Sequence, residues 1–291
     1  AVWNSGVLEI IGGGARLGLD ITREVSASLL TYELYPLGLV GKSLPAVPSI
    51  WKRQKYSRLP VLLIHGIFHN RSAFAWIKQK LAIRGWRHFR EIDLLTSIHP
   101  IPRLAEKVAT YVKQMQAKYG VRQIDIIAHS MGGIVARYYV QRLGGDGTIR
   151  NLITLGSPHN GTLWSRYSIL KHLRELNPKS ALMMSLNAAP PPRHTRVVTI
   201  SAGLDLMVRP KTSGFWPGVR NIYLKRIGHA GLLFSHRVYQ IILATLEEPS
   251  AQPQKLKSQM RYSYHAGHEI VLPATGTMGE LSHAFLGPAH K

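Results

Sequence analysis

The segment Ile126–Tyr139, IIAHSMGGIVARYY, places one serine between an apolar run and a helix-like run, with only small residues at the corner. A sharp strand-turn-helix needs small residues two positions before and two positions after the serine, here Ala128 and Gly132. Such a turn exposes the Ser130 hydroxyl at a helix N-terminus, where free N–H groups stabilise developing negative charge. An ordinary helix N-cap has similar letters, but this context predicts that Ser130 is a nucleophile.

Two neighbouring segments carry the other polar groups that acyl transfer needs. LLIHGI, residues 62–67, ends an apolar run in His-Gly, and we expect the N–H groups of Ile67 and Met131 to form an oxyanion hole. LGSPHNGT, residues 155–162, follows the next apolar run and fits the same edge of the fold. We expect three histidines to be neighbours of the site, the last of them structural: His65, His129 and His159.

Strand and helix patterns alternate along the chain and must position these groups. Short apolar runs bounded by turn residues predict strands at 61–65, 89–93, 123–128, 151–155, 197–201 and 221–226. Helical patterns lie between them, and the clearest has one apolar stripe: Leu104, Val108, Val112, Met115 and Tyr119. This order predicts an α/β fold with a mainly parallel central sheet and helices on both faces. Ligand chemistry collects at the carboxyl ends of such strands, where Ser130 lies.

The chain divides into three zones. Residues 1–58 are expected to hold a docking helix and the basic linker WKRQKYSR, and one face of that helix carries Leu19, Leu29, Leu30 and Leu34. Residues 59–248 form the expected catalytic domain, whose last helix ends before Pro249. The tail, residues 249–291, is rich in Pro, Gly, Ser and His, and we expect it to be flexible or loosely attached.

The composition limits the partners. The 291 residues include 37 Lys and Arg against 15 acidic residues, a formal charge of +22. This excess favours anionic partners such as a membrane surface or lipid interface, or simply keeps the protein soluble. No nucleic-acid module is visible. The absence of cysteine excludes disulfides and thiolate chemistry.

Two features of the sequence bear on the compartment in which the protein is found. No apolar run approaches the roughly 20 residues that span a bilayer, and the sequence begins at Ala1, which is compatible with an upstream signal or anchor. We therefore expect a secreted, periplasmic or membrane-peripheral protein. The oligomeric state stays open.

Five motifs occur in a matching order across residues 60–246: IHGI, AHSMGG, LGSPHNGT, SAGLDLMV and GHAGLLF. In this respect the chain resembles bacterial lipases and esterases of the α/β-hydrolase superfamily. The family's nucleophile motif is Gly-x-Ser-x-Gly, and Ala128 departs from it by one methyl group. The resemblance implies the α/β-hydrolase fold, a serine nucleophile and a Ser-acid-His order along the chain.

The family order guides the choice of acid and base. Downstream of Ser130, Asp205 is the one acid that directly follows a predicted strand, so it would reach the carboxyl edge of the sheet. His229 follows the last predicted strand at the family's Gly-His position. His236, the main rival, begins a helical run and is interpreted as a surface or capping residue.

An insertion at about 162–196 interrupts the alternating pattern. One apolar helix face is expected from Leu163, Trp164, Tyr167, Leu170 and Leu173, and a second from Met183, Met184 and Leu186. We interpret the insertion as a lid or acyl-chain wall, with substrate contacts from Leu163, Trp164, Leu170, Met183 and Met184. The alternative is that these side chains simply cap the core.

These observations predict a serine hydrolase that cleaves lipophilic carboxylic esters, such as acylglycerols, through an acyl-enzyme. An acyltransferase with the same triad, or a phospholipid or polyester hydrolase, stays open. A binding module without activity would require that Ser130, Asp205 and His229 fail to converge. No cofactor is predicted, and no metal site, because no His-x-x-x-His motif on a predicted helix and no matching carboxylate cluster accompanies the histidines.

Overall fold

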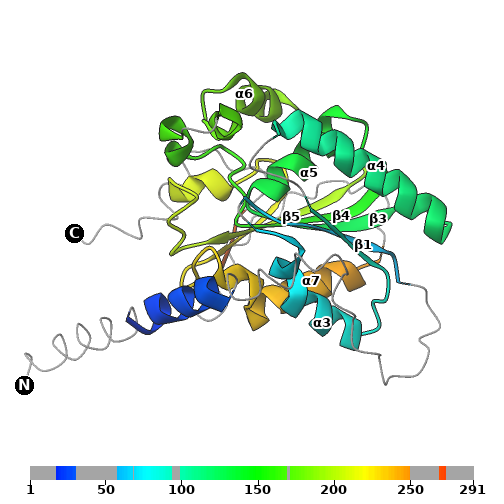
Figure 1. Ribbon diagram of the computed structural model, residues 1–291, viewed down its shortest axis with the longest axis horizontal. Helices are drawn as coiled ribbons and strands as arrows, with labels where there is room; N and C mark the ends of the chain where they lie inside the picture. Colours follow the sequence, from blue (N-terminus) through cyan, green and yellow to red (C-terminus); the bar gives the residue numbers. More distant parts are fainter. Residues whose placement is uncertain are drawn as a thin grey trace, which may run out of the picture.

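A sheet of seven strands, in the order β2-β1-β3-β4-β5-β6-β7, runs through the middle of the computed structural model (Figure 1). The structure describes residues 18–30, 58–67, 69–93, 99–168, 171–249 and 269–272. The strands are β1 (Val61–Ile64), β2 (Phe89–Ile92), β3 (Ile124–His129), β4 (Ile149–Leu155), β5 (Arg196–Ala202), β6 (Arg220–Leu224) and β7 (Glu269–Leu272). The first six are parallel, which confirms the predicted arrangement, and β7 is antiparallel to β6.

Helices cover both faces of the sheet. The α-helices that follow β1 are α3 (Ala75–Ile83), α4 (Ile101–Tyr119), α5 (Met131–Arg142), α6 (Ala181–Ala188) and α7 (His236–Glu247). Short 3-10 turns are η1 (Arg71–Phe74), η2 (Leu163–Tyr167), η3 (Lys171–Leu176), η4 (Lys211–Gly214) and η5 (Gly231–Leu233). Figure 1 shows α4 and α5 on one face and α3 and α7 on the other. The predicted stripe of α4 is buried from Leu104 to Met115.

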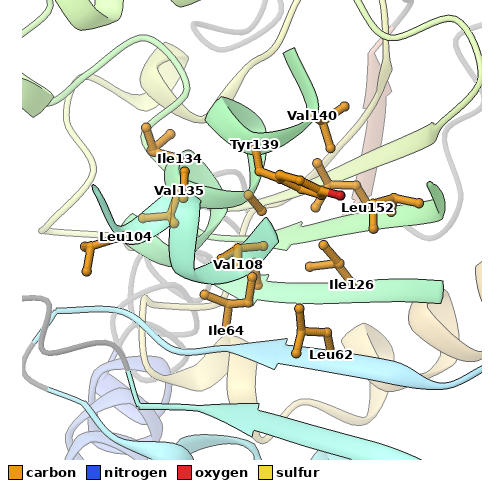
Figure 2. Close-up of a cluster of buried hydrophobic side chains, with 14 of the residues drawn as sticks. Leu62, Ile64, Leu104, Val108, Ile126, Ile134, Val135, Tyr139, Val140 and Leu152 are labelled. Atoms are coloured by element: carbon orange, nitrogen blue, oxygen red, sulfur yellow. The ribbon is translucent and has the colours of Figure 1, made fainter. Parts of the chain in front are cut away.

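Two apolar clusters lie on the two faces because successive strand residues point in opposite directions. Leu62 and Ile64 of β1 pack with the cluster under α4 and α5, which Figure 2 shows in close-up. Val61 and Leu63 pack with the opposite cluster, which includes residues of α3 and α7. Both sets are buried, so β1 is a central strand that is apolar on both sides.

The strand register places the carboxyl ends of four strands at one edge. His129 of β3 pairs with Leu155 of β4, Leu155 with Ile200 of β5, and Ile200 with Ile222 of β6. The loops that follow these strands therefore leave the sheet side by side. They carry Ser130, the LGSPHNGT segment, Asp205 and His229.

The insertion is less regular than the sequence predicted. Instead of one helix face from Leu163 to Leu173, the chain forms the two short turns η2 and η3. Ser168 ends η2 because its backbone is extended, with φ −69° and ψ 132°. Helix α6 follows, and Met183 packs in the core below it.

The helix at residues 18–30 does not dock through the expected leucines. Asp20 and Ala27 are buried, whereas the large apolar side chains that are exposed include Leu19, Ile21, Val25, Leu29 and Leu30. Leu34 and residues 51–57 of the basic linker lie outside the described residues, as does most of the tail. Strand β7 within the tail was not predicted. In the part of the chain that is described, no helix has the length and apolar character to cross a membrane.

Candidate active site

Ser130 lies in a strained turn between β3 and α5. Among the described residues it is the one non-glycine residue with a positive φ, at φ 54° and ψ −129°. A side chain in this conformation is costly and persists only where the surroundings enforce it. Here the Ser130 N–H donates to the Leu155 carbonyl at 2.8 Å, and its own carbonyl accepts from Gly133 N at 3.0 Å.

The small residues of the motif are required by contacts with β1. A Cβ atom added at Gly132 would lie 2.5 Å from the carbonyl oxygen of His65 and 2.6 Å from that of Ile64, both backbone atoms. Ala128, two residues before Ser130, is fully buried in the core, so the extra methyl group is accommodated. The departure from the Gly-x-Ser-x-Gly pattern therefore leaves the turn intact.

Asp205 and His229 form a direct pair. His229 Nδ1 lies 2.7 Å from Asp205 Oδ2, and the other carboxylate oxygen, Oδ1, accepts from Met207 N at 2.8 Å and Val208 N at 2.9 Å. Asp205 is buried, whereas the His229 side chain is 14% exposed. The carboxylate thus fixes the imidazole with Nδ1 protonated, which leaves Nε2 free to accept a proton.

The imidazole of His229 lies over the edge that carries the serine. Its ring centroid is 4.6 Å from that of His129, the residue before Ser130. His129 Nε2 donates to the His229 carbonyl at 3.2 Å, which ties the two loops together. A Cβ atom at Gly156, after β4, would lie 3.2 Å from His229 Nδ1, so the ring also packs on that backbone.

The expected oxyanion donors flank the same serine. Gly66 passes so close to the turn that an added Cβ atom would lie 2.7 Å from Ser130 Cβ, which brings the Ile67 backbone near the serine. Met131 is the first residue of α5, where backbone N–H groups have no carbonyl partner within the helix. Both residues therefore lie where a negatively charged oxygen could be bound.

Other histidines at this edge are held neutral. Burial lowers the pKa of His65 and His129, and it lowers the pKa of His69 to about 4, with a further contribution from the charge of His229. His159, buried with Nε2 2.8 Å from Thr154 Oγ1, has its pKa lowered well below 6.5 by burial. His236 is exposed at the start of α7 and contacts Gln240. His229 is therefore the histidine of this set that is paired with a buried carboxylate.

The expected substrate contacts that the structure describes differ in their exposure. Met183 is fully buried, whereas its neighbour Met184 is 61% exposed. Leu163 and Trp164 are also exposed, and Leu170 lies outside the described residues. Arg137 fixes this region to α5 by donating to the carbonyls of His159 and Leu186, both at 2.7 Å. The acyl-chain role of these residues stays a prediction.

Sequence reasoning missed two polar groups that support the site. Arg137 is 1% exposed, and burial lowers its pKa to about 9. In the sequence, the one indication of its role is that a charged residue lies within the apolar run that follows Ser130. Glu24 contacts the loop of His229 from the helix at 18–30, and no pattern in the sequence links the two segments. Within the described residues, no group of three or more His, Asp or Glu side chains could hold a metal ion.

Comparisons with known proteins agree with the fold and motifs. Residues 60–187 match the family model described as palmitoyl protein thioesterase. Triacylglycerol lipase of Burkholderia plantarii is 27% identical over 134 residues, which cover 43% of this chain and 37% of that protein. This chain therefore aligns with well under half of its curated relative.

Solved structures are similar in fold at low sequence identity. Lipase BlEst2 of Bacillus licheniformis, in its mature form, has a TM-score of 0.56 at 14% identity, covering 70% of this chain and 96% of that chain. Aspergillus fumigatus lipase B has a TM-score of 0.54 at 14% identity, covering 72% of this chain and 57% of that chain. The α/β-hydrolase fold and the resemblance to lipases and esterases are confirmed.

Proposed function

We propose that this α/β-hydrolase-fold protein is a serine hydrolase that cleaves lipophilic carboxylic esters through an acyl-enzyme. The observation that carries the proposal is the buried Asp205 carboxylate 2.7 Å from His229, at the sheet edge where Ser130 occupies a strained turn. Strain of this kind at a polar residue is typical of a functional site. The Ser-acid-His order along the chain supports the same interpretation.

In this mechanism Ser130 Oγ attacks the carbonyl carbon of the ester while His229 Nε2 accepts the hydroxyl proton. The negative oxygen that forms is bound by the N–H groups of Ile67 and Met131. His229 then donates the proton to the departing alkoxide, which leaves Ser130 acylated. Water then attacks the acyl carbonyl carbon while giving up a proton to His229, the bond between that carbon and Ser130 Oγ breaks, and His229 returns the proton to Oγ as the acid is released. Asp205 stabilises the imidazolium in both halves without becoming protonated.

A lipid-like substrate is supported by the surface next to Asp205. Leu206 and Met207 follow the acid directly and are exposed, as are Leu163 and Trp164 on the neighbouring loop. Trp164 Nε1 donates to the Leu206 carbonyl at 2.9 Å, so the two loops form one apolar rim. Exposed apolar groups gathered in one place mark contacts with lipid or protein.

The charge around this rim suits an anionic interface. Exposed basic residues flank it: Arg166, Arg209 and Lys211. We infer that the rim contacts anionic lipid aggregates, since basic side chains near a membrane each contribute about 1 kcal/mol of attraction. Binding to vesicles that contain anionic lipid should therefore exceed binding to neutral vesicles and weaken as salt rises. Equal and salt-insensitive binding would contradict this part of the proposal.

A panel of p-nitrophenyl esters from C2 to C16, with product analysis in water and in the presence of an alcohol, tests the reaction. The wild-type protein should release free acid, and Ser130→Ala should remove nearly all turnover while the protein stays folded. Near-normal turnover by purified, folded Ser130→Ala would overturn the nucleophile assignment. An acyl ester of the added alcohol as the main product would indicate an acyltransferase.

Thioester hydrolysis is a second candidate, favoured by the match of residues 60–187 to palmitoyl protein thioesterase. The same triad would act, because a thiolate leaves from the tetrahedral intermediate more readily than an alkoxide. A palmitoyl thioester and the matching oxygen ester, compared at equal concentration, separate the two candidates. A much larger kcat/KM for the thioester would make it the preferred substrate class.

A further inference from the structure

The helix at residues 18–30 is attached to the catalytic domain by polar contacts. Its buried residues include Asp20, at 6% exposure, whereas Ile21 and Val25 are more than half exposed. Figure 1 shows this helix in dark blue at the lower left of the molecule. Because its largest apolar side chains stay exposed, hydrophobic burial gives little of its attachment. The position of this helix on the catalytic domain is therefore set mainly by its carboxylates.

Two carboxylates, one helical turn apart, contact the loop that carries His229. Asp20 Oδ2 accepts from Arg226 Nε at 2.6 Å, three residues before the histidine. Glu24 Oε1 accepts from the N–H of Ala230 at 2.7 Å, and Oε2 accepts from that of Gly231 at 2.9 Å. Residues on both sides of His229 are thus held from the same face of one helix.

The loop is shaped around the Glu24 carboxylate. A Cβ atom added at Gly228 would lie 2.1 Å from Glu24 Cδ, and one added at Gly231 would lie 2.8 Å from Oε2. The glycines at these two positions let the backbone wrap closely around the charge. Hydrogen bonds from backbone N–H groups to a carboxylate are about twice as strong as neutral ones.

We propose that Glu24 is a positioning residue for His229, supported by Asp20, so that the 18–30 helix sets the geometry of the base. The inference rests on the proposed hydrolase function. Asp205 and the packing on Gly156 orient the imidazole ring, and His129 Nε2 binds the His229 carbonyl, but none of these contacts binds the backbone N–H groups after the histidine. Glu24 binds the first two backbone N–H groups beyond the histidine and fixes that part of the loop.

The test compares Glu24→Ala and Glu24→Gln with Ser26→Ala, a control at an exposed position of the same helix. Active sites are titrated with a fluorophosphonate, and kcat and KM for a short p-nitrophenyl ester are expressed per titrated site. For Glu24→Ala we expect kcat to fall on the order of 10- to 100-fold with KM unchanged, because a displacement of about 1 Å costs as much. The kcat of Glu24→Gln should lie between those of the wild type and Glu24→Ala, since the glutamine side chain has one accepting oxygen in place of the two of the carboxylate.

A merely structural role for Glu24 gives a different result. The melting temperature and the number of titratable sites would then fall, while kcat per site stayed at the wild-type value, and this would overturn the inference. If Glu24→Ala does not fold, Glu24→Gln and Glu24→Asp are judged by the same kcat per site. A wild-type protein that neither hydrolyses esters nor reacts with the fluorophosphonate would overturn the proposed function and this inference together. Active wild type with fully active Glu24 variants would overturn this inference alone.

Discussion

Replacing Asp205 with asparagine should nearly abolish turnover by reversing the imidazole tautomer. Asp205 Oδ1 accepts from two backbone N–H groups, those of Met207 and Val208, while Oδ2 faces His229 Nδ1. In the variant, the amide oxygen must stay with the two N–H donors, because turning it would lose two hydrogen bonds of about 0.5–1.5 kcal/mol each. The side-chain NH₂ then faces Nδ1, which can only accept from it, so the proton moves to Nε2 and the base is blocked.

The expected loss in kcat is about 10⁴-fold, equivalent to about 5.5 kcal/mol of transition-state stabilisation. The measurement is kcat with a p-nitrophenyl ester, beside the melting temperature. Asp146→Asn is the matched control, since Asp146 also accepts from loop N–H groups, those of His194 and Thr195, away from the triad. A loss of less than tenfold in Asp205→Asn, with normal folding, would refute the assignment of Asp205 as the acid.

Three further outcomes are expected. His229→Ala should lower kcat by several orders of magnitude, whereas His236→Ala, at an exposed position, should leave it near the wild-type value; the reverse ranking would make His236 the base. Lowering the pH from 7 to 5 should destabilise the fold, because burial holds the pKa of His65, His69 and His129 below 6.5. The unfolded chain then binds more protons than the folded chain, so the free energy of unfolding falls below about pH 6.5 by about 1.4 kcal/mol per pH unit for each such histidine. Urea unfolding at pH 5, 6 and 7 measures this slope, and a pH-independent midpoint would contradict it. Trp164→Ser and Met184→Gln should lower kcat/KM more for C16 than for C4 esters, since each methylene buried contributes about 0.8 kcal/mol, with little change in melting temperature. Met183→Ala should instead lower the melting temperature and affect all chain lengths alike, and a uniform effect of Trp164→Ser would argue against an acyl contact.

The sheet and the positions of Ser130, Asp205 and His229 at its edge were predictable because their signals are local. A central parallel strand is apolar on both sides, so a run such as 61–64 stands out as short, continuous and bounded by turn residues. Once the strands are in order, the carboxyl ends of β3, β5 and β6 locate Ser130, Asp205 and His229 without any knowledge of side-chain contacts. The order of the strands therefore predicts that the three residues lie at one edge, which no single motif predicts.

Other features were not predictable because they depend on contacts between distant segments. Glu24 and Ala230 are 206 positions apart, and the pattern of leucines in the helix at residues 18–30 suggested that the leucines, and not the carboxylates, would make its contacts. Met183 and Met184 are adjacent on α6, so composition alone could not tell which of them faces the core. Strand β7 pairs with β6 at the edge of the sheet, far along the chain from its partner.

The two halves of the site are stabilised in physically different ways. Ser130 is kept in its strained backbone conformation by the packing around it, since the nearby Ala128 and Met131 are buried in the core. Its geometry therefore depends on the packing of the whole domain. His229 lies on a loop that is held by hydrogen bonds to two carboxylates. Its imidazole donates to Asp205, and the backbone N–H groups of the next two residues donate to Glu24. Such a loop can open locally at a lower free energy than the core, so the position of the base is the more adjustable half of the site.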